Sequence, residues 1–219
     1  DLGKARYRLQ REHERSESLL LNILPPSIAE RLKEQQETIA DDFDDASVLF
    51  ADVVGFTTLA STQTASETVR MLNSIFSHFD ASVDAHGLEK IKTIGDAYMV
   101  ASGVPKPSED HASRLLAFAL HMFEMLQVHN ETHGHQLQLR IGVNAGPVTA
   151  GVIGSRKFTY DLWGDTVNVA SRMESSGVPG RVQVSEPVAA AAAADFLFED
   201  RGVVDIKGKG EMRTFLLVG

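Results

Sequence analysis

Short apolar runs alternate with helical repeats along the chain from Ser47 onward. Runs rich in β-branched residues predict strands, and apolar residues spaced three or four apart predict helices. Strands are expected at 47–54, 88–95, 97–102, 137–144, 148–153, 159–163, 181–184 and in a terminal pair ending at 214–218, and helices at 64–87, 108–130, 165–175 and 187–194. The core order, strand, helix, strand, strand, helix, strand, is that of a ferredoxin-like βαββαβ fold, so we expect an α+β domain.

Local signals mark two of these elements closely. Thr64 followed by Glu67 is a capping box that predicts a helix start, and Gly87 predicts its end. Gly95 and Asp96 make a tight turn between the strands at 88–95 and 97–102. We therefore expect a hairpin with Asp96 at its tip.

The first 44 residues follow a different pattern. Residues 1–17 form a mixed-charge helical segment, and Leu2, Leu9, Ser16 and Ile23 fall seven apart from its start onward. This is a poor heptad seam, which leaves two alternatives. Two such helices form a coiled coil because the rest of the protein dimerises, or the segment is a single solvated helix that frays. Pro25 and Pro26 interrupt the pattern, and a short helix is expected at 27–36.

Four aspartates follow, at 41, 42, 44 and 45. They lack the glycine and the distal glutamate of an EF-hand loop, so we expect a solvated loop. We accordingly divide the chain into a helical segment, 1–44, and a globular domain, 45–219.

Composition narrows the possible classes. The 219 residues are 43% hydrophobic, which suits one compact domain plus an appendage. A net charge of -9 argues against a nucleic-acid partner, and the lack of cysteine excludes disulfides and thiolate chemistry and is compatible with the cytoplasm. No apolar run approaches the ~20 residues of a membrane span, but the chain begins at Asp1 without methionine, so we expect a fragment of a longer protein.

The main candidates for chemistry are Asp52 and Asp96, each at the end of an apolar run and near a glycine. Mg²⁺ prefers oxygen ligands and is usually held by one or two carboxylates plus phosphates, so two carboxylates on neighbouring strand ends suggest a shared metal site. Alone, Asp52 is also compatible with a helix cap or a lysine pair, and Asp96 is a weaker signal still, because Gly-Asp pairs often form ordinary hairpin turns.

Phosphate contacts are expected beside Asp52. Gly55 ends the first strand, and a short helix is predicted to begin at Phe56 and Thr57. Free backbone N–H groups at a helix start bind phosphate oxygens, and glycine allows close approach.

Further polar candidates lie in the C-terminal half. Asn168 and Arg172 are four apart and share one helix face, where they can grip a sugar and a phosphate or form an exposed polar stripe. Asp161 lies just upstream. Lys207 stands beside Gly208, which suits either a phosphate contact or a plain β-turn.

Three motifs, at 50–57, 90–96 and 161–172, occur in the order found in one family. They read FADVVGFT, KIKTIGD and DLWGDTVNVASR, and with them the chain from about Leu19 to its C-terminus resembles the catalytic domain of a class III nucleotidyl cyclase. Residues 20–35 resemble the segment that precedes this domain in membrane-anchored bacterial adenylate cyclases of the mycobacterial type and in receptor guanylate cyclases. The resemblance implies a cytoplasmic catalytic domain with a membrane region upstream.

The resemblance also implies roles at the metal site. Asp52 and Asp96, with the Val53 carbonyl, would hold two Mg²⁺ or Mn²⁺ ions. One ion would activate the ribose 3′-hydroxyl, and the other would hold the triphosphate.

The remaining roles concern the nucleotide. By the same resemblance, Asn168 would orient the ribose, Arg172 would stabilise charge on the α-phosphate, and Lys207 would contact the terminal phosphates. Lys92 and Asp161 would recognise the base. Some members place a phosphate-binding arginine where this chain has Pro147, so Lys207 or Arg156 is expected to serve instead.

The identity of the base is not decided by donor and acceptor inventory, because lysine and aspartate can complement adenine or guanine. The resemblance favours adenine, since guanylate cyclases typically carry glutamate and cysteine at these two positions. We expect an adenylate cyclase acting on ATP; the alternatives are a guanylate cyclase and a catalytically silent dimerisation or nucleotide-sensing module.

The resemblance further implies a head-to-tail dimer. Each site would take its metal aspartates from one chain and its base, ribose and phosphate residues from the other. All these groups occur in this one chain, so a homodimer is sufficient.

Overall fold

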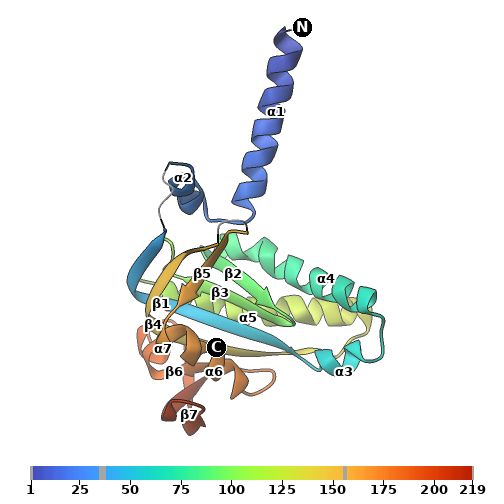
Figure 1. Ribbon diagram of the computed structural model, residues 1–219. Helices are drawn as coiled ribbons and strands as arrows, with labels where there is room; N and C mark the ends of the chain where they lie inside the picture. Colours follow the sequence, from blue (N-terminus) through green and yellow to red (C-terminus); the bar gives the residue numbers. More distant parts are fainter. Residues whose placement is uncertain (1, 35–37, 155–156, 219) are drawn as a thin grey trace.

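Two long antiparallel strands, β1 (Ala40–Val54) and β4 (Gln138–Ile153), form the centre of the sheet (Figure 1). The structure is a computed structural model that describes residues 2–34, 38–154 and 157–218. The other strands are β2 (Glu89–Ile94), β3 (Ala97–Ser102), β5 (Thr159–Trp163), β6 (Val182–Ser185), β7 (Phe198–Ile206) and β8 (Gly210–Leu217). The sheet order is β2-β3-β1-β4-β6-β8-β7, with β5 paired to β4. The segment β2-β3-β1-β4 is the ferredoxin-like core, so the predicted α+β fold is confirmed.

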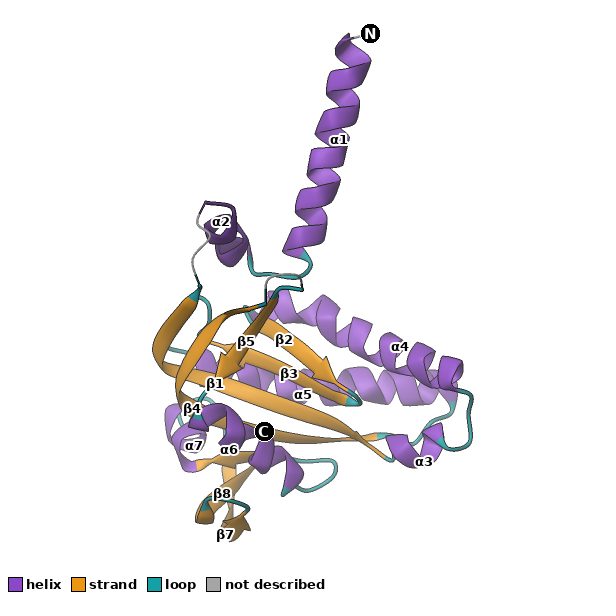
Figure 2. Ribbon diagram, viewed as in Figure 1, coloured by secondary structure: helices purple, strands orange, loops and turns teal. Residues whose placement is uncertain are grey.

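Helices cover both faces of this sheet (Figure 2). The helix α4 (Ala65–Val83) and the helix α5 (His111–His133) pack with Leu49 and Ala51 of β1 in one apolar cluster. On the other face, Val48 and Phe50 share a second apolar cluster with residues of α2 (Pro26–Glu34), α6 (Asp165–Ser175) and the strand β5. Alternate β1 residues thus face opposite layers, as the strand period of two requires. Asp52 has the parity of Phe50 and faces the α6 layer.

The predicted helix limits hold for α4. Thr64 and Glu67 form the capping box, with the Thr64 N–H donating to Glu67 Oε2 at 2.8 Å. After Val83 a 3₁₀ turn, η1 (Asp84–His86), leads to Gly87 at φ 64°. The helix α5 is displaced by three residues from its predicted range, 108–130, because its C-terminal turn continues to Gly134 at φ 68°.

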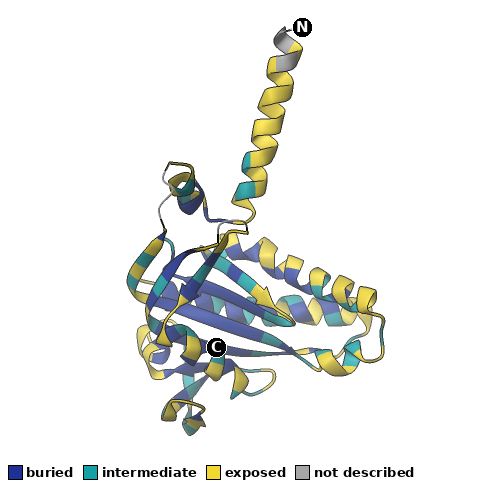
Figure 3. Cartoon of the chain, in the orientation of Figure 1, coloured by how far each residue is buried: buried dark blue, intermediate teal, exposed yellow. Residues whose placement is uncertain are grey.

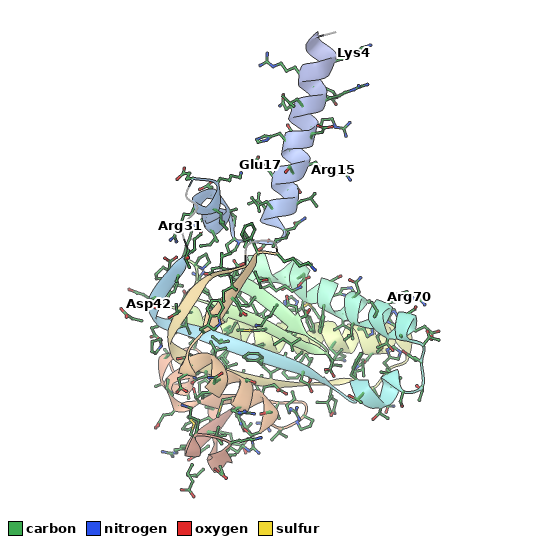
Figure 4. The ribbon with its side chains drawn as sticks, in the orientation of Figure 1. Lys4, Arg15, Glu17, Arg31, Asp42 and Arg70 are labelled. Carbon is green, nitrogen blue, oxygen red and sulfur yellow. The ribbon has the colours of Figure 1, made fainter. Side chains whose placement is uncertain are left out.

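The acidic stretch at 41–45 was expected as a solvated loop, and that prediction is wrong. These residues lie in β1, where Asp41 and Asp42 pair in register with Ala150 and Thr149. The side chains have partners as well: Arg31 of α2 binds Asp41 at 2.5 Å, and Thr149 donates to Asp42 at 2.6 Å. Figure 4 labels Arg31 on α2 and Asp42 on β1. Pairing with β4 provides hydrogen-bond partners for backbone groups that the acidic composition alone predicted to be in a solvated loop.

The strands predicted at 137–144 and 148–153 are one strand, β4. Gly146 and Pro147 indicated a break, yet Gly146 pairs with Ala46 and Val148 with Phe43. A register irregularity in β1 falls between these pairs, so Pro147 lies where the ladder is already interrupted and needs no N–H donor.

The N-terminal helix α1 (Leu2–Leu21) projects from the domain and is exposed over nearly its whole described length (Figure 3). The helix α1 meets the domain at Leu20, which packs against the second apolar cluster. Leu24 and Ile28, which follow α1 in the chain, are buried in that cluster. Within residues 2–34, 38–154 and 157–218, no helix combines the length and apolarity needed to cross a membrane. Two short helices complete the chain, α3 (Phe56–Ala60) and α7 (Glu186–Ala191).

Candidate functional site

The structure brings the two predicted metal carboxylates together where strands end: Asp52 lies near the C-terminal end of β1, and Asp96 lies on the β2–β3 turn. We call this place the carboxylate edge. Asp52 lies opposite Ala97 in the β1–β3 register, one residue past Asp96. The Val53 N–H donates to the Asp96 carbonyl at 3.3 Å, which ties the hairpin turn to the end of β1. Burial raises the pKa of Asp52, the nearby Asp96 raises it further, and Arg140 opposes both. Two half-buried carboxylates held this close favour a cation between them.

Sequence reasoning missed Arg140. It lies directly opposite Asp52 in the β1–β4 register, and its Nη2 is 3.4 Å from Asp52 Oδ2. Its Nε donates to Glu174 Oε1 of α6 at 2.7 Å. Burial is the main cause that raises the pKa of Glu174, while the Arg140 hydrogen bond lowers it. The only sequence signal was an arginine inside an apolar strand, and 88 residues separate it from Asp52.

The donor set fits a hard divalent ion. Asp52 and Asp96 supply carboxylate oxygens, and the adjoining Val53 carbonyl is a further oxygen ligand of the kind Mg²⁺ accepts. In the described ranges no group of three or more His, Cys, Asp or Glu side chains could hold a metal ion. The carboxylate pair therefore supplies two ligands, and Mg²⁺ usually completes its shell with water and phosphates.

The two predicted base-recognition residues are in direct contact. Lys92 of β2 donates from Nζ to Asp161 Oδ2 of β5, although the residues are 69 apart in sequence. Asp161 Oδ1 also accepts from the Leu162 N–H at 2.8 Å, which fixes the carboxylate. The Lys92 side chain is 36% exposed and that of Asp161 16%, so the pair presents one donor and one acceptor to solvent.

The predicted phosphate turn has the expected backbone. Gly55 adopts φ 85° and precedes α3, which begins at Phe56. A left-handed conformation favours glycine here, and a Cβ at this position would meet no atom within 4 Å. Thr57 is exposed and Phe56 half-buried. The turn follows Asp52 directly in the chain.

The residues predicted for ribose and phosphate lie on the exposed side of α6 and on a nearby hairpin. Asn168 and Arg172 are both exposed and four apart on α6. Lys207 is exposed at the β7–β8 turn, and Lys209 of that turn pairs with Asp165 at the start of α6. No contact that the structure gives for the described residues joins these side chains to Asp52 or Asp96. Arg156, the other candidate for the missing arginine, lies outside the described residues.

A ferredoxin-like core with two carboxylates at the end of β1 and on the β2–β3 turn is the architecture of class III nucleotidyl cyclase catalytic domains. The chain belongs to that family: the model for the adenylate and guanylate cyclase catalytic domain matches residues 38–219.

Relatives of known name agree with this assignment. The chain is 52% identical over 220 residues to an adenylate cyclase of Mycobacterium tuberculosis, covering all of this chain and 50% of that protein. It is 44% identical over 210 residues to the soluble guanylate cyclase subunit beta-2 of Rattus norvegicus, covering 94% of this chain and 31% of that protein. The chain thus spans about half the length, or less, of the curated relatives it matches.

Solved structures share the fold. The catalytic core of a rhodopsin-guanylyl cyclase with converted specificity, in complex with ATPαS, matches with a TM-score of 0.79 and 37% identity, covering 84% of this chain and all of that one. The guanylate cyclase domain of RhGC from Catenaria anguillulae, in complex with GTP, matches with a TM-score of 0.78 and 35% identity, covering 82% and 98%.

Proposed function

We propose that this chain is the catalytic domain of an adenylate cyclase, which converts ATP to 3′,5′-cyclic AMP and pyrophosphate. The observation that carries the proposal is the contact between Lys92 of β2 and Asp161 of β5. The 52% identity to a mycobacterial adenylate cyclase supports the same reading.

The base preference follows from the chemistry of this pair. Lysine is a donor only, and an ionised aspartate is an acceptor only. Adenine presents an acceptor at N1 and a donor at its exocyclic amine, so Lys92 would donate to N1 and Asp161 would accept from the amine. Guanine offers O6 and N1–H, which the same pair can meet, and a guanylate cyclase is therefore the alternative to be tested.

The carboxylate edge would hold the reacting groups. Asp52 and Asp96, with the Val53 carbonyl, would bind two Mg²⁺ or Mn²⁺ ions. When bound, such ions lower the pKa of the attacking hydroxyl and neutralise the leaving phosphates. Arg140 carries a guanidinium at the same edge, so we add it to Lys207 and Arg156 as a residue that would contact the triphosphate.

The remaining residues would position the nucleotide. Asn168 would orient the ribose so that its 3′-oxygen faces the α-phosphorus, and Arg172 would stabilise charge that develops as pyrophosphate leaves. Backbone N–H groups at Gly55, Phe56 and Thr57, with Lys207, would contact the phosphates.

A head-to-tail homodimer would assemble these two sets of residues. Asn168 and Arg172 are exposed on α6, and among the described residues no hydrogen bond or ion pair joins either side chain directly to Asp52 of its own chain. In a twofold dimer the same surfaces meet twice, so two equivalent sites form. The solved relatives include a non-canonical dimeric guanylyl cyclase domain from Blastocladiella emersonii, an example of association between such domains and not of this arrangement.

Two further proposals concern organisation. We retain the division into a helical segment, 1–44, and a catalytic domain, 45–219, while noting that β1 begins at Ala40. The likeness of residues 20–35 to the segment that follows a membrane region supports an anchored protein with its catalytic domain in the cytoplasm.

The direct experiment incubates the purified chain with ATP or GTP and Mn²⁺, then identifies the product by mass. Cyclic AMP from ATP, with little cyclic GMP from GTP, is expected. Preferential formation of cyclic GMP would make the chain a guanylate cyclase. Nucleotide binding or dimerisation without any cyclic product would make it a silent module.

A further inference from the structure

The helix α6 lies unusually close to strand β4. A Cβ added at Gly142 would sit 1.9 Å from the Glu174 backbone nitrogen, and one added at Gly146 would sit 2.9 Å from Thr166 Oγ1. Both ends of α6 therefore rest on glycines of one strand. Such a smooth contact gives close packing, but it does little to fix the helix against sliding or tilting.

A buried amide holds the N-terminal end. Asn144 of β4 is 6% exposed, and its Nδ2 donates to the Thr166 carbonyl at 3.0 Å. The amide is itself oriented by Ser185 of β6, whose Oγ donates to Asn144 Oδ1 at 2.6 Å. A carbonyl has two lone pairs, so Thr166 can accept this bond in addition to its helical one. The bond thus locates the turn that leads into Asn168.

A second buried amide holds the C-terminal end. Gln183 of β6 is fully buried, and its Nε2 donates to the Met173 carbonyl at 3.1 Å and to Ser176 Oγ at 2.9 Å. Its Oε1 accepts from Arg201. Met173 immediately precedes Glu174, which binds Arg140 beside Asp52. This amide therefore locates the end of α6 that leads to the metal carboxylates.

We propose that Asn144 and Gln183 are positioning residues that fix the two ends of α6 for two different active sites. The inference rests on the proposed head-to-tail dimer. There, Asn168, in the turn that Asn144 holds, serves the partner's metal site, whereas the Glu174–Arg140–Asp52 contacts, at the end that Gln183 holds, serve the site of their own chain. Asn144 thus acts on one site and Gln183 on the other.

The matched variants are Asn144→Asp and Gln183→Glu. Each keeps the acceptor oxygen, toward Ser185 or Arg201, and removes the N–H donor to the α6 carbonyl. A displacement of about 1 Å at a reacting group can cost about 10²-fold in rate. We expect kcat to fall 10- to 100-fold in Asn144→Asp with the metal requirement unchanged. In Gln183→Glu we expect the Mn²⁺ concentration for half-maximal activity to rise several-fold.

Protonation supplies a check on the first variant. A neutral carboxyl at position 144 regains an O–H donor toward Thr166, so the activity of Asn144→Asp relative to wild type should recover as the pH is lowered. Unfolding free energy measured over the same pH range gives the comparison: kcat per folded enzyme should recover, whereas a merely structural defect would recover only the folded fraction. If Asn144→Asp fails to fold, Ser185→Ala is the second variant. It removes the hydrogen bond that orients the Asn144 amide but keeps Asn144 itself, so a smaller fall in kcat is expected.

Subunit mixing separates the two roles. Asn144→Asp should regain activity when mixed with Asp52→Ala but not with Asn168→Ala. Gln183→Glu should show the reverse pattern. The assignment of each amide to its own site would be overturned in either of two cases. Both amide variants could recover with the same mixing partner, or each could recover equally with Asp52→Ala and with Asn168→Ala.

The composite site of the proposed function is tested separately from the positioning roles of Asn144 and Gln183. If Asp52→Ala and Asn168→Ala form mixed dimers and do not complement each other, the composite site itself is wrong. Complementation by that pair, together with the wrong pattern for the amide variants, would overturn only the positioning roles.

Discussion

Asp52 and Arg140 face each other across β1 and β4, with 3.4 Å between Oδ2 and Nη2, and Arg140 also binds Glu174 of α6. One guanidinium thus joins a metal carboxylate to the helix that carries Asn168 and Arg172. Because Arg140 contacts both carboxylates, we expect its removal to affect both folding and activity.

We expect Arg140→Met to lose about 1 to 3 kcal/mol of unfolding free energy, because the buried Glu174 is left unpaired. Adding Glu174→Gln should restore most of that stability. Activity should stay about 10²-fold low in both variants, because the phosphate contact is missing. Urea unfolding and cyclase rates measure the two effects. A double variant that regains activity together with stability would remove Arg140 from the site.

Lys92→Met tests base recognition. The pair with Asp161 is partly exposed, and such pairs contribute about 0 to 1 kcal/mol, so the melting temperature should change little. Loss of a hydrogen bond to a charged group costs about 1.5 to 3 kcal/mol, so kcat/KM for ATP should fall roughly 10- to 100-fold. Asp161→Asn is the matched variant. Unchanged kcat/KM for ATP in both would exclude the pair from base recognition.

Mixing Asp52→Ala with Asn168→Ala tests the composite site. Each variant alone should be nearly inactive, whereas the mixed dimer contains one site with an intact Asp52 and an intact Asn168. Activity should therefore return on mixing, in proportion to the mixed dimers measured by affinity tags. Mixed dimers that remain inactive would show that each site is built from a single chain.

Arg172→Ala tests transition-state stabilisation. Arg172 is exposed on α6, so its removal should leave folding intact. By analogy with oxyanion-hole donors, kcat should fall about 10²- to 10³-fold, or about 2.7 to 4 kcal/mol. The KM for ATP should stay close to wild type. A raised KM with unchanged kcat would instead assign Arg172 to ground-state binding.

The buried His129 makes the free energy of unfolding depend on pH in the acidic range. It is 4% exposed, and burial, with smaller effects from His133, His135 and His78, lowers its pKa from 6.5 to about 4. Between these values the unfolded chain binds a proton that the folded chain does not, so stability falls as pH falls from 6.5 to 4. We expect His129→Leu to remove on the order of 2 kcal/mol of this loss, measured by urea unfolding across that range.

The matched control is His13→Gln on the exposed helix α1, which should follow wild type. Glu67 and Arg70 of α4 line the same cavity as His129 and carry opposite charges. Glu89 opposes the trend, because burial and Asp84 raise its pKa to about 7, so its contribution is lost as pH rises. The His129 effect is therefore read as the difference between variant and wild type. Parallel stability curves would contradict it.

The sequence by itself determined the local elements and much of the site. The period of two in β1, the capping box at Thr64 and the Gly95–Asp96 turn are encoded within a few residues of one another. Because the two carboxylates lie at the ends of paired strands, the βαββαβ order was enough to bring Asp52 and Asp96 together.

Only the tertiary structure decided the rest, since strand register joins residues that are distant in sequence. It placed Arg140 opposite Asp52, paired Lys92 with Asp161, and seated α6 on Asn144 and Gln183. It also placed the aspartates at 41–45 in β1 and continued β4 past Pro147. Local composition indicated a loop and a break there, but cross-strand hydrogen bonds outweigh local preference once the partner strand is present.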